Sequence, residues 1–193
     1  MYGSIAKSSI RIENTVATAD LKQAVDLNSI VQAFPWVKYQ PEVFPGLVYR
    51  LEEPKTSTLI FSSGKMVCTG GKSEKLARKA VTKVVDELRK KKILTVEKPD
   101  IEIQNIVASG ELGKTIDLDK AAYSLEKTMY EPEQFPGLIH RMSEPKVVIL
   151  LFSTGKFVCV GAKKEEEIHR AITKLQETLD MKGLISYQQE SEK

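Results

Sequence analysis

The chain has 193 residues, 41% of them apolar and 28% charged, which is ordinary for a soluble globular protein and argues against a disordered chain. No run approaches the ~18 apolar residues of a membrane span, and we expect no signal peptide. Its two cysteines lack a metal-ligand spacing, which favours a reducing compartment over a disulfide-rich or zinc-binding protein.

The first half predicts a mixed α and β fold. Residues 1–9 are polar, and we expect a flexible N-terminus. Ile10–Thr18 alternates with a period of two and predicts a strand, while Asp26 can cap a short helix that Pro35 ends. The predicted elements are strand Ile10–Thr18, helix Leu27–Phe34, strand Leu47–Leu51, hairpin strands Thr56–Ser62 and Lys65–Gly70, and helix Glu74–Lys91 after the cap Ser73.

The second half repeats the first without a gap, at an offset of 91 residues. Of 81 aligned positions, 33 are identical, so the halves are duplicates, and the period is too long for a solenoid. We expect repeats over residues 10–91 and 101–182, a linker over 92–100 and a polar C-terminal tail over 183–193. The corresponding elements are strand Ile101–Ser109, helix Leu118–Leu125, strand Leu138–Met142, hairpin Val147–Gly161 and helix Lys164–Asp180.

The charge of the two repeats has diverged although their pattern is shared. Residues 10–90 carry 13 basic and 9 acidic side chains (+4), and residues 101–181 carry 10 basic and 13 acidic ones (−3). Either sign alone would suit an ordinary solvated surface. The contrast between matched repeats suggests that the two halves meet different neighbours.

Both predicted hairpins are apolar on both faces. In the first, Leu59, Phe61, Val67 and Thr69 share one face, and Ile60, Met66 and Cys68 share the other. The second repeat follows the same pattern. The two long helices can cover one face, and no further helix is available for the other. A large uncovered apolar face usually marks a binding site.

We expect Cys68 and Cys159, which are matched between the repeats, to be buried packing residues. A disulfide or a redox role is the alternative.

Basic residues lie at or near the ends of the predicted strands and would surround the apolar face. They are Arg50, Lys65, Lys72, Arg141, Lys156 and Lys163. An apolar floor with a basic rim suits a ligand with an apolar centre and anionic edges. The minor groove of a DNA duplex has that character, with sugars and base edges inside and phosphates outside.

At these residues the chain resembles a known family. The twice-repeated FPGL-x-x-R, EPK and LxF-S-x-G-K-x-V-C-x-G-x-K motifs, with N-x-V-A at Asn14 and Asn105, are similar to the core of the TATA-box-binding proteins, in its archaeal form. The likeness covers about residues 8–182. It implies an α+β fold: a pseudo-two-fold saddle of two tandem repeats, whose curved antiparallel ten-stranded sheet carries four helices on its convex face.

The resemblance also implies a function, that of a general transcription initiation factor which binds and kinks the minor groove of AT-rich promoter DNA. The family is itself a standard example of this binding mode. Its DNA-intercalating residues match Phe44, Phe61, Phe135 and Phe152. Its hydrogen-bonding base contacts match Asn14, Asn105 and Thr69, although Val160 replaces the partner of Thr69. The apolar floor matches Val16, Val67, Val107, Val158, Leu59 and Leu150, and the phosphate contacts match the six basic residues named above.

The resemblance further implies protein partners. Glu131, Glu133 and Gln134 match a loop that binds transcription factor B in the family, and RNA polymerase would be engaged indirectly. We expect no cofactor, no metal and no membrane, and a homodimer is conceivable without DNA. Localisation would be cytoplasmic with the nucleoid in an archaeon and nuclear in a eukaryote.

Two other classes of function are alternatives to this one. A DNA-repair enzyme built on this fold would need a catalytic residue in a pocket and a base-flipping module. The two histidines, His140 and His169, are not part of a cluster suited to metal or nucleophile chemistry. We therefore expect no enzyme. A pure protein-interaction module is the second alternative.

Overall fold

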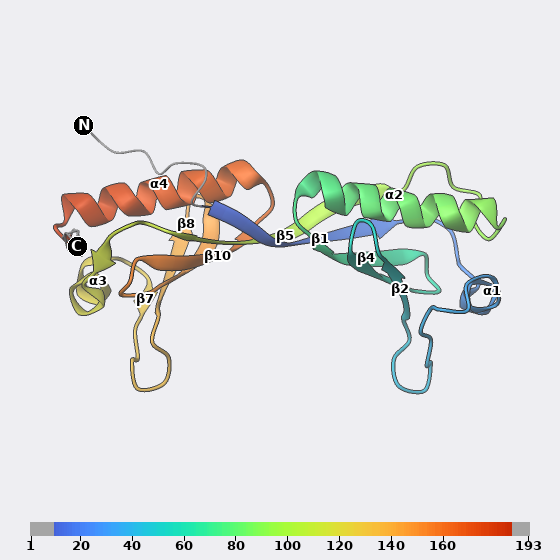
Figure 1. The fold of residues 1–193 in the computed structure, drawn as a ribbon, viewed down its shortest axis with the longest axis horizontal. Coiled ribbons are helices and arrows are strands. Elements are labelled where there is room, and N and C mark those ends of the chain that lie inside the picture. Colours follow the sequence, from blue (N-terminus) through green and yellow to red (C-terminus); the bar gives the residue numbers. More distant parts are fainter. Residues whose placement is uncertain (1–9, 187–193) are drawn as a thin grey trace, which may run out of the picture. The chain divides into compact units, whose positions relative to one another are not determined.

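The computed structural model describes residues 10–186 (Figure 1). They fall into two compact units, here called the first unit (residues 13–105) and the second unit (residues 10–12 and 106–186). The boundaries fall within the strands that begin the two repeats. The second unit therefore includes the first residues of the first repeat, 10–12, and the first unit includes residues 101–105 of the second repeat. The predicted N-terminal segment 1–9 and the tail beyond residue 186 lie outside the described residues.

The first unit contains four antiparallel strands in the order β2-β3-β4-β1, followed by the first part of β5. Asp26 caps α1, its carboxylate accepting the Asn28 N–H at 3.0 Å. Ser73 caps α2, its hydroxyl accepting the Leu76 N–H at 3.1 Å. The elements are β1 Ile10–Asp20, α1 Leu27–Ala33, β2 Leu47–Leu51, β3 Thr56–Ile60, β4 Lys65–Gly71 and α2 Glu74–Lys90.

The second unit repeats this arrangement with the strand order β5-β10-β9-β8-β7. A separate pair of short strands, β6 and β11, joins the segment before α3 to the segment after α4. The elements are β5 Asp100–Glu111, β6 Thr115–Ile116, α3 Leu118–Ser124, β7 Thr128–Met129, β8 Leu138–Ser143, β9 Lys146–Leu151, β10 Lys156–Ala162, α4 Glu165–Met181 and β11 Ile185–Ser186.

The described residues contain nine main-sheet strands, where ten were expected. The missing strand is the counterpart of β7. At the matching place in the first repeat, Lys38 forms a single antiparallel bridge with Val48, as Met129 does with Ile139 in β7. The sequences of the two repeats differ at this edge: Pro35 and Trp36 stand where the second repeat has Glu126 and Lys127. The first repeat accordingly forms a single bridge here instead of a two-residue strand.

One face of each sheet is buried beneath a long helix. In the first unit α2 packs on β3 and β4, and in the second unit α4 packs on β10 (Figure 1). The covered side chains alternate along the strands, as the period of two predicts, and they have almost no exposed surface. They include Ile60, Met66 and Cys68 in the first unit and Leu151, Phe157 and Cys159 in the second.

The two cysteines are free thiols inside the core, as expected for packing residues. Burial raises the pKa of Cys159 to about 12 and that of Cys68 above its usual value. Both thiols are therefore protonated and poor nucleophiles at neutral pH.

The first residues of the predicted tail 183–193 pack against the second unit: Leu184 is 3% exposed, and β11 pairs with β6. The rest of that segment, 187–193, lies outside the described residues. Within residues 10–186, no helix is both long and apolar enough to cross a bilayer.

Candidate nucleic-acid interface

The face of each sheet opposite its long helix, here called the open face, remains partly accessible to solvent. In the first unit it carries Leu59 and Val67, which are cross-strand partners, and in the second unit Leu150 and Val158, likewise paired. Each of these side chains is half-buried, while its neighbours along the strand are fully buried. The open face is therefore an apolar floor at the surface of each unit.

A pair of phenylalanines stands at the end of the open face in the first unit. The Phe44 and Phe61 ring centroids are 5.9 Å apart, and the rings are inclined by 67° in an edge-to-face contact. Phe44 is 41% exposed, and Phe61 is half-buried. Neither ring lies beneath the helix, so both remain available to a ligand.

The second unit has the same pair with nearly the same geometry. Phe135 and Phe152 are 5.9 Å apart at 66°, and Phe135 is 38% exposed. Phe152 precedes the turn of its hairpin, where its N–H donates to the Lys156 carbonyl and its carbonyl accepts the Gly155 N–H, both at 2.9 Å. The tight turn thus sets the position of this ring, and Phe61 is held in the same way.

A glycine lies directly under each phenylalanine pair. A Cβ on Gly46 would lie 2.5 Å from Cε1 of Phe44, and a Cβ on Gly137 would lie 2.7 Å from Cε1 of Phe135. No real contact is that short, so the rings can rest on the backbone only where the side chain is absent. Sequence reasoning gave these glycines no role of their own, although their repetition after each Phe-Pro is visible in the sequence.

Asn14 is held on β1 by three contacts. Its Oδ1 accepts the Gly70 N–H at 2.7 Å and lies 3.2 Å from the Thr69 hydroxyl, while its Nδ2 donates to that hydroxyl at 3.0 Å. Since the Gly70 N–H can only donate, it fixes which end of the amide is oxygen. The amide has a second N–H, which can donate to an acceptor on a ligand.

The matching position in the second unit is less polar. Asn105 occupies the equivalent place on β5, but Val160 replaces Thr69, and Val148 lies opposite Val160 where Ser57 lies opposite Thr69. The hydroxyl that positions Asn14 therefore has no counterpart. The two open faces differ at this point in hydrogen-bonding capacity.

The open face is wider than the predicted set of residues. Val48 pairs with Leu59, and Ile139 pairs with Leu150, and both added side chains are half-buried. The alternation of the edge strands β2 and β8 carried this signal. Val16, Val107 and the other predicted floor residues are likewise half-buried on β1, β5 and the hairpins.

Each open face is hollowed beside its phenylalanine at the hairpin. The hollow at Phe61 has a volume of about 680 Å³ and is also lined by Thr18 and Lys65. The hollow at Phe152 has a volume of about 870 Å³ and includes the equivalent residues Ser109 and Lys156. The same depression thus occurs in both units.

The six predicted basic residues are all exposed. The rim was expected to be basic, but acidic residues also contribute to it. Lys65 lies opposite Asp20 and Lys156 opposite Glu111 across the strand pairs. Lys72 donates to the Glu13 carbonyl at 2.6 Å and lies 3.9 Å from its carboxylate. The prediction used the hairpins alone and overlooked the acids contributed by β1 and β5.

The loops before β2 and β8 extend away from the sheet of their own unit (Figure 1). In each loop a turn directs the chain toward the phenylalanine: the Phe44 N–H donates to the Gln40 carbonyl, and the Phe135 N–H to the Glu131 carbonyl, both at 2.9 Å. Glu131, Glu133 and Gln134 are exposed, as is Val43 at 81%. The second loop therefore presents two acids, and the first presents one acid, Glu42, beside an apolar side chain.

Among residues 10–186, no group of three or more His, Cys, Asp or Glu side chains is arranged to hold a metal ion.

Comparison with known proteins gives concordant matches. The family model for transcription factor TFIID (or TATA-binding protein, TBP) matches residues 9–91 and 100–181. The TATA-box-binding protein of Pyrodictium occultum is 55% identical over 90% of this chain and 87% of its own length, and that of Sulfolobus acidocaldarius is 53% identical over 88% and 86%. The solved structure of Methanococcus jannaschii TBP superposes with a TM-score of 0.82 at 44% identity, covering 90% of this chain and 99% of that one.

The glycine under each phenylalanine pair can be tested by substitution. In Gly46→Ala the added methyl group should force Phe44 away from Phe61, because in the unaltered protein the Phe44 ring occupies the space that this methyl group needs. Ring-to-ring nuclear Overhauser contacts should disappear for this pair and persist for Phe135 and Phe152, which serve as an internal control. Unchanged contacts at Phe44 would show that the close approach does not hold the ring.

Proposed function

The chain belongs to the TATA-box-binding protein family, and on that premise we propose that it is a general transcription initiation factor that binds the minor groove of AT-rich promoter DNA. The observation that carries the proposal is the open face: an apolar floor, present in both units, with a partly exposed phenylalanine pair at its end. The names of the relatives state the same ligand for those proteins.

The chemistry of the floor favours A·T base pairs. The amide of Asn14 has an N–H for the N3 of adenine or the O2 of thymine, which occupy similar places in A·T and T·A. The valines and leucines of the floor offer no acceptor to the exocyclic amine of guanine, which would project into them. The proposed protein therefore selects A·T content and deformability more than an exact sequence.

The phenylalanine pairs are proposed to kink the DNA. An apolar ring can replace a base-stacking partner without requiring a hydrogen bond, so it can enter a base step that has opened. Phe44 and Phe135 are already exposed at about two fifths of their surface. Covering such exposed aromatic rings removes apolar surface from water and therefore favours binding. Each pair would act on one end of the bound element.

The two halves of a bound site should be read unequally. The Thr69 hydroxyl accepts a hydrogen bond from Asn14 and positions its amide. Val160, at the matching position, has no hydroxyl that could position Asn105 in this way. We propose that the half-site on the first unit is read with the stricter hydrogen-bond geometry.

The acidic loop is proposed to bind transcription factor B, and through it the complex would recruit RNA polymerase. Glu131 and Glu133 are exposed beside Phe135, whereas the equivalent loop carries Gln40 and Glu42 with the apolar Val43. Because the loops differ in charge, a partner can distinguish the two ends of the protein. The assembled complex would then have a direction.

Without DNA the open face would leave apolar surface in water, and we propose that two copies can cover it by pairing. The relatives named above come from archaea, which suggests that the protein acts at the nucleoid in the cytoplasm. Neither proposal is needed for the binding of DNA.

A mobility-shift titration separates this function from the alternatives of a protein-interaction module and a repair enzyme. An AT-rich duplex should bind at least about tenfold more tightly than a GC-rich duplex of equal length, because a mismatched position typically costs ~1–3 kcal/mol. Equal affinity for the two duplexes would contradict the proposed function, and so would turnover of the bound DNA.

The wedge role of the phenylalanines is tested with a duplex that carries a donor and an acceptor dye at its ends. Replacing Phe135 and Phe152 with Ala should reduce the change in energy transfer on binding, because no ring remains to hold the base step open. The matched control is Phe44→Ala with Phe61→Ala, which should act at the other end. Full bending by the Phe135/Phe152 variant would exclude a wedge at that pair.

The partner loop is tested by charge reversal. Glu131→Arg should leave binding of the AT-rich duplex nearly intact and weaken the ternary complex with factor B by about tenfold or more, because it places like charges together. Gln40→Arg, at the equivalent position of the first repeat, is the control and should leave the ternary complex unchanged. Loss of DNA binding by Glu131→Arg alone would refute the assignment.

The basic rim is tested by salt dependence. Each lysine that neutralises a phosphate contributes about 0.9 to the slope of log K against log salt. Lys163→Ala should lower that slope by nearly this amount. Lys72→Ala should lower it by less, because Glu13 already compensates Lys72, whereas the equivalent residue in the second repeat is the uncharged Gln104. Equal decreases, measured by fluorescence anisotropy over a salt series, would show that Glu13 has no influence.

A further inference from the structure

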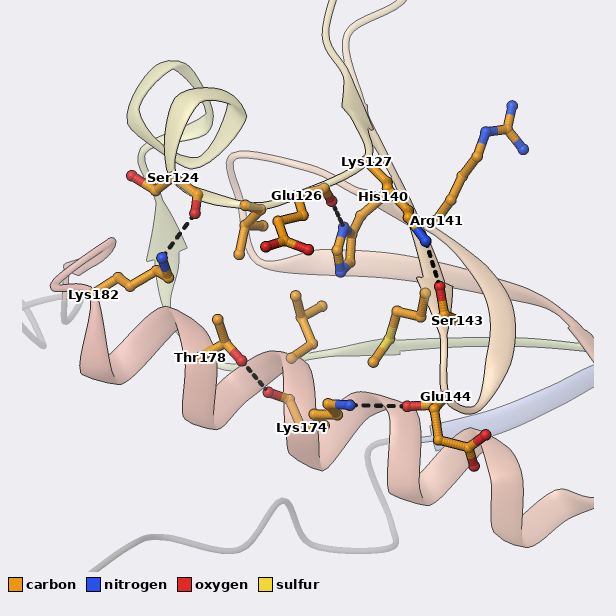
Figure 2. A pocket seen from close by; sticks show the side chains of 13 residues that line it. Ser124, Glu126, Lys127, His140, Arg141, Ser143, Glu144, Lys174, Thr178 and Lys182 are labelled. Carbon is orange, nitrogen blue, oxygen red and sulfur yellow. Dashed lines mark hydrogen bonds between the residues drawn. The ribbon is translucent and has the colours of Figure 1, made fainter.

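A cavity of about 350 Å³ lies in the second unit between β8, the segment from Ser124 to Lys127, and α4 (Figure 2). It is on the helix side of the sheet and contains none of the phenylalanines of the open face. Arg141 is among the lining residues, and its guanidinium points away from the cavity (Figure 2). The cavity is therefore separate from the proposed DNA site.

The same place in the first unit is filled by aromatic side chains. Tyr49 is fully buried, its ring 5.3 Å from Phe34 and 6.3 Å from Trp36, and Phe34 and Trp36 are 5.2 Å apart. The Tyr49 hydroxyl donates to the Glu87 carboxylate. Here a phenol ring with a bonded hydroxyl is enclosed by two further rings.

The second repeat keeps the frame and loses the rings. At the frame, Lys174 donates to the Glu144 carbonyl at 3.1 Å, as Lys83 donates to the Glu53 carbonyl at 2.8 Å. Each of the three aromatic residues of the filled site is replaced by a smaller or non-aromatic one: Phe34 by Leu125, Trp36 by Lys127 and Tyr49 by His140. Glu87, which accepts the Tyr49 hydroxyl, is replaced by Thr178. The cavity is the space that these changes open.

His140 gives the cavity one specific polar group. Its Nδ1 lies 3.1 Å from the Glu126 carbonyl, and since a carbonyl can only accept, Nδ1 carries the proton. Burial lowers the pKa of His140, so the ring is neutral at neutral pH. The bare Nε2 is then an acceptor, and Figure 2 shows the ring directed toward the space between β8 and α4.

The remaining lining defines the shape and polarity of a fitting ligand. Leu125, Met142 and Leu175 give apolar walls. At the two ends, Lys182 donates to the Ser124 carbonyl at 2.9 Å and Lys127 to the Ser143 hydroxyl at 2.6 Å. Each of these ammonium groups has a protein acceptor, and the lining combines the apolar walls with polar groups that include His140, Thr178, Glu126 and Glu144.

We propose that this cavity binds an aromatic ring with a hydrogen-bond donor on its edge, a phenol or an indole, whose O–H or N–H donates to His140 Nε2. The ring takes the space beside His140 that the Phe34 and Trp36 rings occupy beside Tyr49 in the first unit. It comes either from a tyrosine or tryptophan side chain of a partner polypeptide or from a free aromatic metabolite. Both sources share the chemistry, and the experiment distinguishes them.

The test is a titration of the full-length protein with p-cresol and with toluene, followed by nuclear magnetic resonance. Residues around His140 should shift saturably with p-cresol, and toluene, which lacks only the hydroxyl, should bind about fivefold more weakly because the hydrogen bond is lost. An absence of saturable shifts in the cavity, or equal binding of the two ligands, overturns the proposal.

Two variants locate the effect. His140→Phe keeps a ring and removes the acceptor, and it should abolish the preference for p-cresol over toluene. The combined change Lys127→Trp and His140→Tyr copies the first repeat, and it should fill the cavity and abolish binding of both ligands. Both variants should bind AT-rich DNA like the unaltered protein, which controls for folding. A persistent preference in His140→Phe overturns the role of Nε2.

The source of the ring is distinguished by two further ligands in the same titration. N-acetyl-L-tyrosinamide represents a side chain within a polypeptide, and L-tyrosine represents a free metabolite with its charged ends. Tighter binding of the former supports a partner polypeptide, and tighter binding of the latter supports the metabolite. Failure of both, with p-cresol bound, overturns the assignment to tyrosine-type ligands.

Discussion

The structure depends on one constraint: each sheet has two apolar faces and a single long helix to cover them. Strand alternation places Ile60, Met66 and Cys68 under α2 and leaves Leu59 and Val67 on the other side. Burying the first set stabilises the unit, at roughly 25 cal/mol per Å² of apolar surface removed from water. The second set contributes comparable stabilisation only when a ligand covers it. Folding and binding therefore depend on the same alternation of apolar residues along the strands.

Duplication explains which features are shared and which are free to differ. Backbone-determined features occur twice with nearly equal geometry: the phenylalanine pairs, the glycines beneath them and the hairpin turns. Features that depend on single side chains have diverged, including Thr69 and Val160, Glu13 and Gln104, and Tyr49 and His140. A ligand of near two-fold symmetry can use the first group, and asymmetric partners can use the second.

The sequence was sufficient for the main elements, because hydrophobic alternation, the Asp26 and Ser73 caps and the repeat act locally. It was insufficient where geometry arises from distant residues. The short strands β6, β7 and β11 have two residues each, too few for a period. Three contacts join parts of the chain that only folding brings together: Phe61 against Gly46, Lys65 opposite Asp20, and the hydrogen bond between Asn14 and Thr69. The cavity at His140 appeared only on comparison of the two folded repeats.

The central claim, that the open face reads a minor groove, is tested most directly by replacing A·T with inosine·cytosine pairs throughout the bound element. Inosine lacks the exocyclic amine of guanine, so such a duplex resembles A·T in the minor groove and G·C in the major groove. The account predicts that affinity measured by mobility shift stays close to that of the A·T duplex. A fall to the affinity of the G·C duplex would mean that the major groove is read and would contradict the account.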